Sequence, residues 1–141
     1  MNITTKNQRG IVIIENLIAL LIFSLGILGL VGMMAVSTKD SATAKYRSEA
    51  SLFAGQIIGQ MWAADKNNAI LKANFESPSG VAYAPWQASV VNSLPGAAAN
   101  PPEIVIDANN VVRVTVSWQG PGEHSPHNFV AVARVIATNH N

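Results

Sequence analysis

The stretch that decides the fold of this chain is RGIVIIENLIALLIFSLGILGLVGMMAV, residues 9–36. From Ile11 to Val36 it is apolar except for the acid Glu15 and a few neutral polar side chains. As a helix rising ~1.5 Å per residue, these ~26 residues would be ~39 Å long, enough to cross a ~30 Å hydrocarbon core with some tilt. The sequence therefore predicts a membrane-spanning helix that follows a short basic leader.

Glu15 is the informative residue of this helix. A carboxylate at the centre of a bilayer costs about 2.5–3.5 kcal/mol on insertion scales, so such a residue usually has a partner and a function. Glu15 lies about one helical turn beyond Ile11, where the nearby interface lowers that cost. Its spacing from Gly10 therefore becomes the feature to explain.

The segment RGIVIIE, residues 9–15, resembles the leader-peptidase site of type IV pilins and pseudopilins. In that family a short basic leader is cut after a glycine on the cytoplasmic face, the new amino terminus is methylated, and the fifth mature residue is a glutamate. The resemblance implies cleavage between Gly10 and Ile11, N-methylation of Ile11, and an assembly role for Glu15. The longer stretch ENLIALLIFSLG, residues 15–26, is most similar to minor pilins of the PilV type.

The resemblance also implies partners and a location. Glu15 would meet the amine of Ile11 on an adjacent subunit, with an attraction of about 4 kcal/mol at ~4 Å and an effective dielectric of 20, before desolvation is subtracted. The implied partners are other major and minor pilins, the prepilin peptidase, the inner-membrane assembly platform and membrane lipid. The implied location is the bacterial inner membrane, with a cytoplasmic amino terminus and a periplasmic carboxyl-terminal domain, and then the pilus at the cell surface.

Three functions remain open at this point. The first is a minor subunit that takes part in type IV pilus assembly, in the priming or tip complex or along the shaft. The second is a minor pseudopilin of a type II secretion system, and the third is a signal-anchored periplasmic binding domain with an uncleaved leader. Lys6 and Arg9 satisfy the positive-inside rule in every case. A secretory signal peptide is disfavoured because its apolar region has only about 7 to 15 residues.

Three glycines, Gly26, Gly29 and Gly32, recur at three-residue intervals within the span. Small residues let helix backbones approach closely in a membrane, although each glycine costs about 0.8–1.0 kcal/mol of helix stability relative to alanine. They mark either a helix-packing face between subunits or only the general frequency of glycine in membrane helices.

Composition narrows the function classes. The chain has 141 residues, is 49% hydrophobic and 12% charged, and has a formal net charge of +1. This balance gives no electrostatic basis for binding nucleic acid. It contains no cysteine, so disulfides, thiol chemistry and cysteine metal sites are unavailable. We predict no enzyme activity, no catalytic residues and no cofactor.

Proline placement predicts the domain organisation. All prolines lie at or after Pro78, so we expect one long helix to about Lys72, followed by irregular and β structure. The fold class is α+β and, by the resemblance, the type IV pilin fold, in which the outer half of the helix packs on a small antiparallel sheet. The expected segments are a leader (1–10), a transmembrane and assembly helix (11–38), an amphipathic outer half (39–75) and a β-rich globular head (76–141). Apolar residues at helical spacing form the expected core strip of the outer half: Tyr46, Ala50, Phe53, Ile57 and Met61.

The head is expected to contain three antiparallel strands. Between Pro85 and Pro95 we expect one or two helical turns, closed by Pro95-Gly96. Tyr83 and Trp86 are interpreted as lids on a small core in preference to partner contacts. The expected strands are Glu103–Asp107, Val111–Trp118 and Phe129–Ala137, with a turn at Ala108-Asn109-Asn110 and a loop from Gly120 to Asn128.

The loop holds the chain's clustered histidines. His124 and His127, with Glu123 beside them, form a nominal metal set. Because a loop between prolines provides no scaffold to fix their geometry, we expect a solvated turn and no metal site. Ser125 lacks any group that would orient a histidine base, so we expect no nucleophile there.

Overall fold

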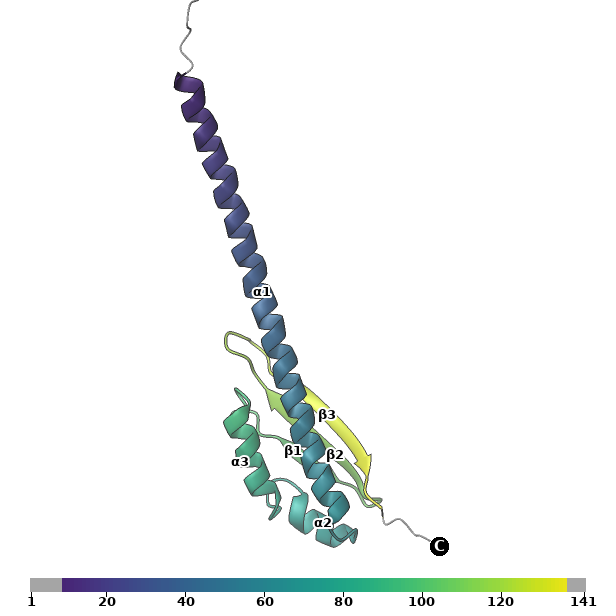
Figure 1. Ribbon diagram of the computed structural model, residues 1–141. Coiled ribbons are helices and arrows are strands. Elements are labelled where there is room, and N and C mark those ends of the chain that lie inside the picture. Colours follow the sequence, from purple (N-terminus) through teal and green to yellow (C-terminus); the bar gives the residue numbers. More distant parts are fainter. Residues whose placement is uncertain (1–8, 137–141) are drawn as a thin grey trace, which may run out of the picture. The chain divides into compact units, whose positions relative to one another are not determined.

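The computed structural model describes residues 9–136 and divides into two compact units, with the division after Ser41. The long helix α1 contributes residues 9–41 to the first unit and residues 42–63 to the second. The elements, labelled in Figure 1, are α1 (Arg9–Ala63), α2 (Asn68–Phe75), α3 (Tyr83–Ser93), β1 (Glu103–Ile106), β2 (Val111–Trp118) and β3 (His127–Arg134).

Within the first unit, α1 is apolar around its whole circumference. Every residue from Ile11 to Ser41 is exposed, including Leu28 at 71% and Met34 at 73%. A helix that is hydrophobic on all sides belongs in a buried or lipid environment. By length and composition, α1 is a helix able to cross a membrane. The expected long amino-terminal apolar helix is thus confirmed.

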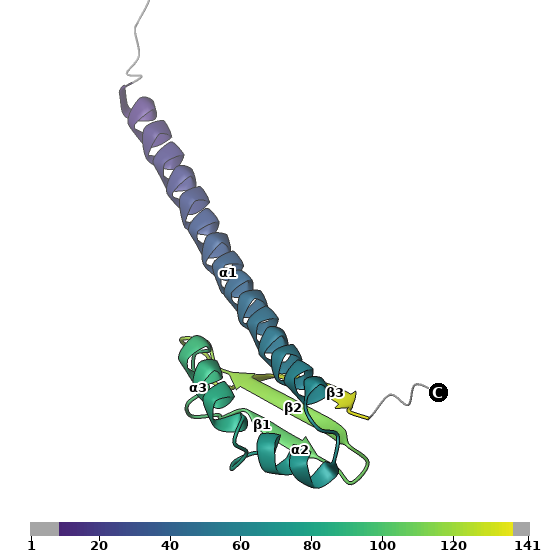
Figure 2. The ribbon, with the colours of Figure 1, turned by 60° about the horizontal axis from the view of Figure 1, so that its bottom comes forward.

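The second unit has a three-stranded antiparallel sheet in the order β1-β2-β3. Ile104 pairs with Val114, and Val116 pairs with Phe129. The alternate β2 residues predicted to face inward are all buried: Val112, Val114, Val116 and Trp118. Figure 2 shows the helical segments of this unit gathered on one face of the sheet. The other face is open and exposes Val105, Val130 and Val132.

The outer part of α1 packs against the sheet through the predicted strip. Ala50, Ile57 and Met61 are fully buried, and Tyr46 and Phe53 pack partly buried against the same core. Ala54 joins them at 0% exposure. The α+β layout, with a long helix whose outer half packs on a small antiparallel sheet, is therefore confirmed. The rest of the core comes from α2, α3 and the chain before and after the strands: Leu71, Phe75, Tyr83, Trp86, Val90, Leu94, Ala97, Ile104, Ile106 and Val135.

The prediction of one helix to about Lys72 is wrong. α1 ends at Ala63, and α2 begins at Asn68. Asn67 takes an extended conformation, and its side chain accepts hydrogen bonds from the N–H groups of Ala69 and Ile70 at 3.0 and 3.4 Å. Asparagine is a favoured N-cap because its short side chain satisfies such free N–H groups. A new helix therefore starts where the pattern suggested continuation.

The helix α3 is longer than the predicted one or two turns. It has 11 residues and begins at Tyr83, so that Pro85 falls in its first turn, where proline is tolerated. The predicted stop at Pro95-Gly96 is confirmed. Gly96 has a φ of 70°, and the carbonyl of Pro95 accepts a 2.8 Å hydrogen bond from the N–H of Gln119.

The strands lie close to their predicted positions, with small shifts at the ends of β1 and β3. β2 has the predicted bounds, and β1 ends one residue earlier than expected, at Ile106. β3 begins at His127 instead of Phe129 and ends at Arg134, so the predicted loop loses His127 and Asn128 to the strand. The predicted end at Ala137 lies outside the described residues.

The turn between β1 and β2 is tied to the segment that joins α1 to α2. Asn110 has a φ of 57°, which asparagine tolerates better than most residues. Its amide nitrogen donates to the carbonyl of Lys66 at 2.7 Å, and its amide oxygen accepts from Asn68 at 2.6 Å. Asn68 also donates to the carbonyl of Asp107 at 2.7 Å. One asparagine thus joins the helical connection to the hairpin.

The outer edge of β1 is occupied by the chain that follows α2. The Ser77 hydroxyl donates to the Ile104 carbonyl at 2.9 Å and accepts from the Ile104 N–H at 3.0 Å. The Ile106 N–H donates to the Glu76 carboxylate at 3.2 Å. The Ile104 carbonyl also accepts from the Ser77 backbone N–H at 3.1 Å, so these three groups of the edge are satisfied by Glu76 and Ser77.

Candidate functional site

The predicted cleavage and methylation site lies at the start of α1. The helix begins at Arg9, so Gly10 and Ile11 are both helical, and the Ile11 side chain is 68% exposed. The rest of the predicted leader, residues 1–8, including Lys6, lies outside the described residues. Processing between Gly10 and Ile11 and methylation of Ile11 stay predictions.

Glu15 is the acid of the apolar segment, and its carboxylate is solvent-exposed. It lies four residues, or ~6 Å of helix rise, beyond Ile11. Within the described part of the chain, no ion pair of Glu15 is found. The hydroxyl of Ser24, further along the same segment, donates instead to its own helix at the Leu20 carbonyl, 2.7 Å away. A serine can satisfy its polarity locally in this way, whereas a carboxylate needs an external cation or donor.

The three glycines of the span present open backbone. A Cβ atom added at Gly26, Gly29 or Gly32 would meet no atom within 4 Å. α1 continues unbroken through all three positions. The helix is thus open to close approach there, and the helix-packing role stays a prediction.

The histidine loop is more ordered than the sequence suggested. His127 belongs to β3, and its Nε2 lies 3.1 Å from the Glu123 carboxylate. The same carboxylate accepts a 2.9 Å hydrogen bond from the Gly120 N–H, and the Gln119 side chain donates to the Glu123 carbonyl at 2.7 Å. The expectation that nothing fixes this loop is therefore wrong, because the Glu123 carboxylate contacts both Gly120 and His127. Among the residues described, no group of three or more potential metal ligands is found.

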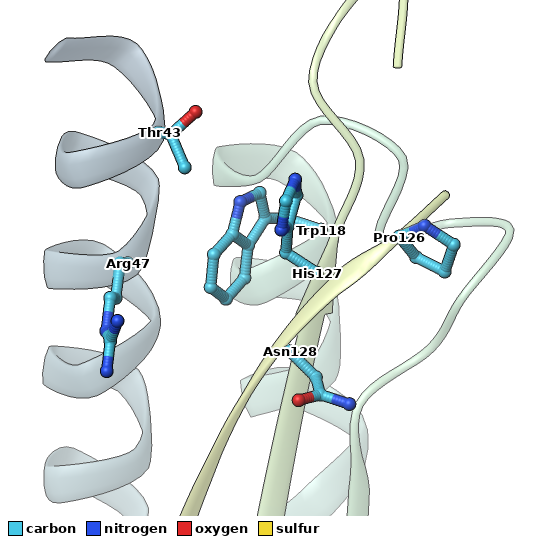
Figure 3. A pocket seen from close by; sticks show the side chains of 6 residues that line it. All are labelled: Thr43, Arg47, Trp118, Pro126, His127 and Asn128. Atoms are coloured by element: carbon cyan, nitrogen blue, oxygen red, sulfur yellow. The ribbon is translucent and has the colours of Figure 1, made fainter. Parts of the chain in front are cut away.

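A cavity beside this loop was missed from the sequence. It has a volume of about 340 Å³ and lies between α1, the end of β2 and the start of β3, within the second unit. Its lining residues, drawn in Figure 3, are Thr43, Arg47, Trp118, Pro126, His127 and Asn128. The ring of His127 stacks on Trp118, with centroids 5.7 Å apart and an interplanar angle of 23°. Alternation in β2 identifies Trp118 as inward-facing, but no sequence signal brings Arg47 to it.

The aromatic pair of α3 belongs to the core, as interpreted from the sequence. Tyr83 is 2% exposed and Trp86 is 4% exposed. Trp86 Nε1 donates to the Phe53 carbonyl of α1 at 3.0 Å, and the Tyr83 hydroxyl donates to the Pro102 carbonyl at 2.6 Å. Both polar tips are thereby used inside the protein, which leaves neither ring as an exposed partner contact.

Comparison with protein-family models, with curated proteins and with solved structures finds no match.

Proposed function

We propose that this chain is a minor pilin that is cut by a prepilin peptidase after Gly10, is methylated on the new amine of Ile11, and takes part in type IV pilus assembly. The observation that supports the proposal most is the first unit of α1. It is an exposed apolar helix with its acid, Glu15, one turn beyond Ile11 and without an ion pair in the described chain.

The physical role of Glu15 follows from its surroundings. An exposed helix that is apolar on all sides is stabilised by lipid or by other apolar helices. In either setting a carboxylate without a cation is costly, so a cationic partner from another chain lowers the free energy of the assembled state. The amine released at Ile11 of an adjacent subunit is such a cation. The proposed pair would set the axial register between neighbouring helices.

The second unit supports the same proposal. The outer part of α1 and a small antiparallel sheet share one core, which is the layout that the resemblance to pilins implies. We place the amino terminus in the cytoplasm and the second unit in the periplasm, because the basic leader favours the cytoplasmic side. The prepilin peptidase, other pilins and the inner-membrane assembly platform are the partners in this proposal.

Mass spectrometry of the protein purified from its own membranes tests the proposal. We expect a chain that begins at Ile11 and has one added methyl group. Gly10→Leu should insert normally and remain uncut, since a bulky side chain before the cut would not fit a site for glycine. Gly26→Leu is the matched control and should be cut normally. A native chain that still begins at Met1, in cells with an active peptidase, would leave a signal-anchored domain as the better account.

Deletion of the gene separates the two filament systems. The proposal predicts fewer surface pili and impaired twitching motility, with protein secretion unchanged. A secretion defect with normal pili would assign the chain to a type II secretion system as a minor pseudopilin.

A further inference from the structure

Trp118, one of the residues that line the cavity beside Arg47, has a buried polar group for which the described residues provide no partner. Trp118 is 2% exposed, and its Nε1 is buried without a hydrogen-bond partner in the described chain. Trp86, the other buried tryptophan of this unit, has its Nε1 paired with a carbonyl. Leaving a buried donor unpaired costs about 1–3 kcal/mol, whereas a phenylalanine would fill the position without that cost. A hydrogen-bond acceptor at the Trp118 N–H would therefore remove this cost.

The direction of this N–H points to the α1 side of the cavity. Figure 3 shows the indole of Trp118 between α1 and the ring of His127, with its nitrogen edge toward Thr43. Thr43 and Arg47 are one helical turn apart on α1, and both line the cavity. The indole and the Arg47 side chain thus both line the cavity on its α1 side.

The charges around the cavity select an anion. Arg47 is exposed, and no ion pair of Arg47 is found among the described residues. None of the described residues that line the cavity is an Asp or a Glu. The nearby acid, Glu123, is held by the Gly120 N–H and lies against His127 Nε2, in the loop. The lining thus includes a permanent cation, Arg47, and the indole of Trp118.

The size of that charge favours a carboxylate over a phosphate. A guanidinium matches the two oxygens of a carboxylate in a planar, two-point contact. Among the described lining residues, Arg47 alone has a permanent charge, which balances a single negative charge but not the nearly double charge of a phosphate monoester. The stacked rings of Trp118 and His127 form a flat wall along which a planar carboxylate fits.

We propose that this cavity is a binding site for a carboxylate group, paired with the Arg47 guanidinium and hydrogen-bonded by Trp118 Nε1–H. Because Nε1 is covered in this structure, the proposed contact requires a lining side chain to move. The group is either the acidic side chain of another protein or a small free carboxylate. This site is independent of the leader and of Glu15, so its test does not depend on pilus assembly.

The test follows the indole N–H signals of the full-length, ¹⁵N-labelled protein in detergent micelles by NMR. Trp118→Phe identifies the Trp118 signal by its loss. Two probes are titrated at constant ionic strength against sodium chloride: sodium acetate for a free carboxylate, and the end-blocked tripeptide Gly-Glu-Gly for an acidic side chain. We expect saturable shifts of the Trp118 signal, with a Kd for acetate on the order of 1 mM because so small a ligand makes few contacts. The probe that binds more tightly identifies the source.

Arg47→Gln should weaken either probe by about tenfold or more, which corresponds to about 1.4 kcal/mol. Arg113→Gln is the matched control, since Arg113 is an exposed arginine on the open face of the sheet, and it should leave binding unchanged. Unchanged Trp62 and Trp86 signals would show that each variant is folded. The proposal is overturned if neither probe moves the Trp118 signal, if chloride moves it equally, or if folded Arg47→Gln binds as well as the unaltered chain.

Discussion

The hydroxyl of Tyr83 donates a 2.6 Å hydrogen bond to the carbonyl oxygen of Pro102, which joins the first residue of α3 to the chain just before β1. Burial of the hydroxyl, and to a lesser extent the negative charge of Glu103, raises the pKa of Tyr83 above its ordinary value of 10.0. The neutral phenol is the donor in this bond, so the folded protein holds its proton more tightly than the unfolded chain does.

Stability should therefore fall at high pH through Tyr83. Below pH 10.0 the contribution of Tyr83 is fully present, and it is lost as the pH rises through the higher folded-state pKa, because the unfolded chain releases the proton first. Urea denaturation of the full chain in micelles, followed by tryptophan fluorescence, measures the free energy of unfolding at each pH. Tyr83→Phe should lower it by about 1–3 kcal/mol at pH 7 and flatten its fall above pH 10.0. An equally steep fall in this variant would assign the effect to other groups.

Replacement of Asn110 should loosen the connection between the helices and the hairpin. Asn110→Ala removes its hydrogen bonds with Lys66 and Asn68 and forces alanine into the left-handed region, so we expect a loss of about 2–4 kcal/mol. Asn110→Gly relieves the backbone strain alone and should lose less. Asn109→Ala, at the exposed neighbouring position, should change stability by less than about 0.5 kcal/mol. The same denaturation assay checks all three, and equal losses at both positions would contradict the proposed role of Asn110.

Substitutions at two glycines would distinguish the cost of backbone strain from the cost of close packing. Gly96 and Gly122 both have positive φ, 70° and 76°. A Cβ on Gly96 would lie 2.7 Å from the Cβ of Gln119, whereas one on Gly122 would meet no atom within 4 Å. Gly122→Ala should therefore cost about 1–2 kcal/mol from the backbone alone, and Gly96→Ala should cost clearly more. The difference between the two, measured by denaturation, is the cost of the close approach between Gly96 and Gln119.

Removal of the Glu15 charge should separate processing from assembly. Glu15→Ala should be cleaved normally but enter filaments about tenfold less often, if the net value of the proposed pair is ~1.4 kcal/mol. Immunoblots of sheared filaments against whole-cell protein measure this ratio. Asn16→Ala is the control for a polar side chain next to the acid and should be incorporated normally. Normal incorporation of Glu15→Ala would remove the pairing role.

Periodicity explains which parts of the fold could be predicted. Alternation along Val112, Val114 and Val116 gave the inward face of β2, and the helical spacing of Ala50 and Ile57 gave the core strip, because both patterns are local consequences of burial. The end of the helix at Ala63 was not predicted, because neither glycine nor proline occurs at that point in the sequence. The cap at Asn67 was the available signal.

The predictability of the site residues also depends on whether they are close in sequence or are brought together only by packing. Gly10, Ile11 and Glu15 are close in sequence, so their spacing could be interpreted directly. Arg47 and Trp118 come to line the same cavity only after α1 has packed on the sheet and β2 has paired with β3. A cavity of this kind depends on long-range packing, and no spacing rule in one sequence predicts it.

The side chains of Glu76 and Ser77, which occupy the outer edge of β1, also bear on aggregation. An uncovered strand edge is a template to which a second extended chain can add. Because the N–H groups of Ile104 and Ile106 are already taken, a further strand cannot add at β1 without first displacing two side chains. Sheet growth between crowded copies is thereby discouraged on that side, and Ser77→Ala would free only the Ile104 N–H, because the Ser77 N–H still donates to the Ile104 carbonyl at 3.1 Å.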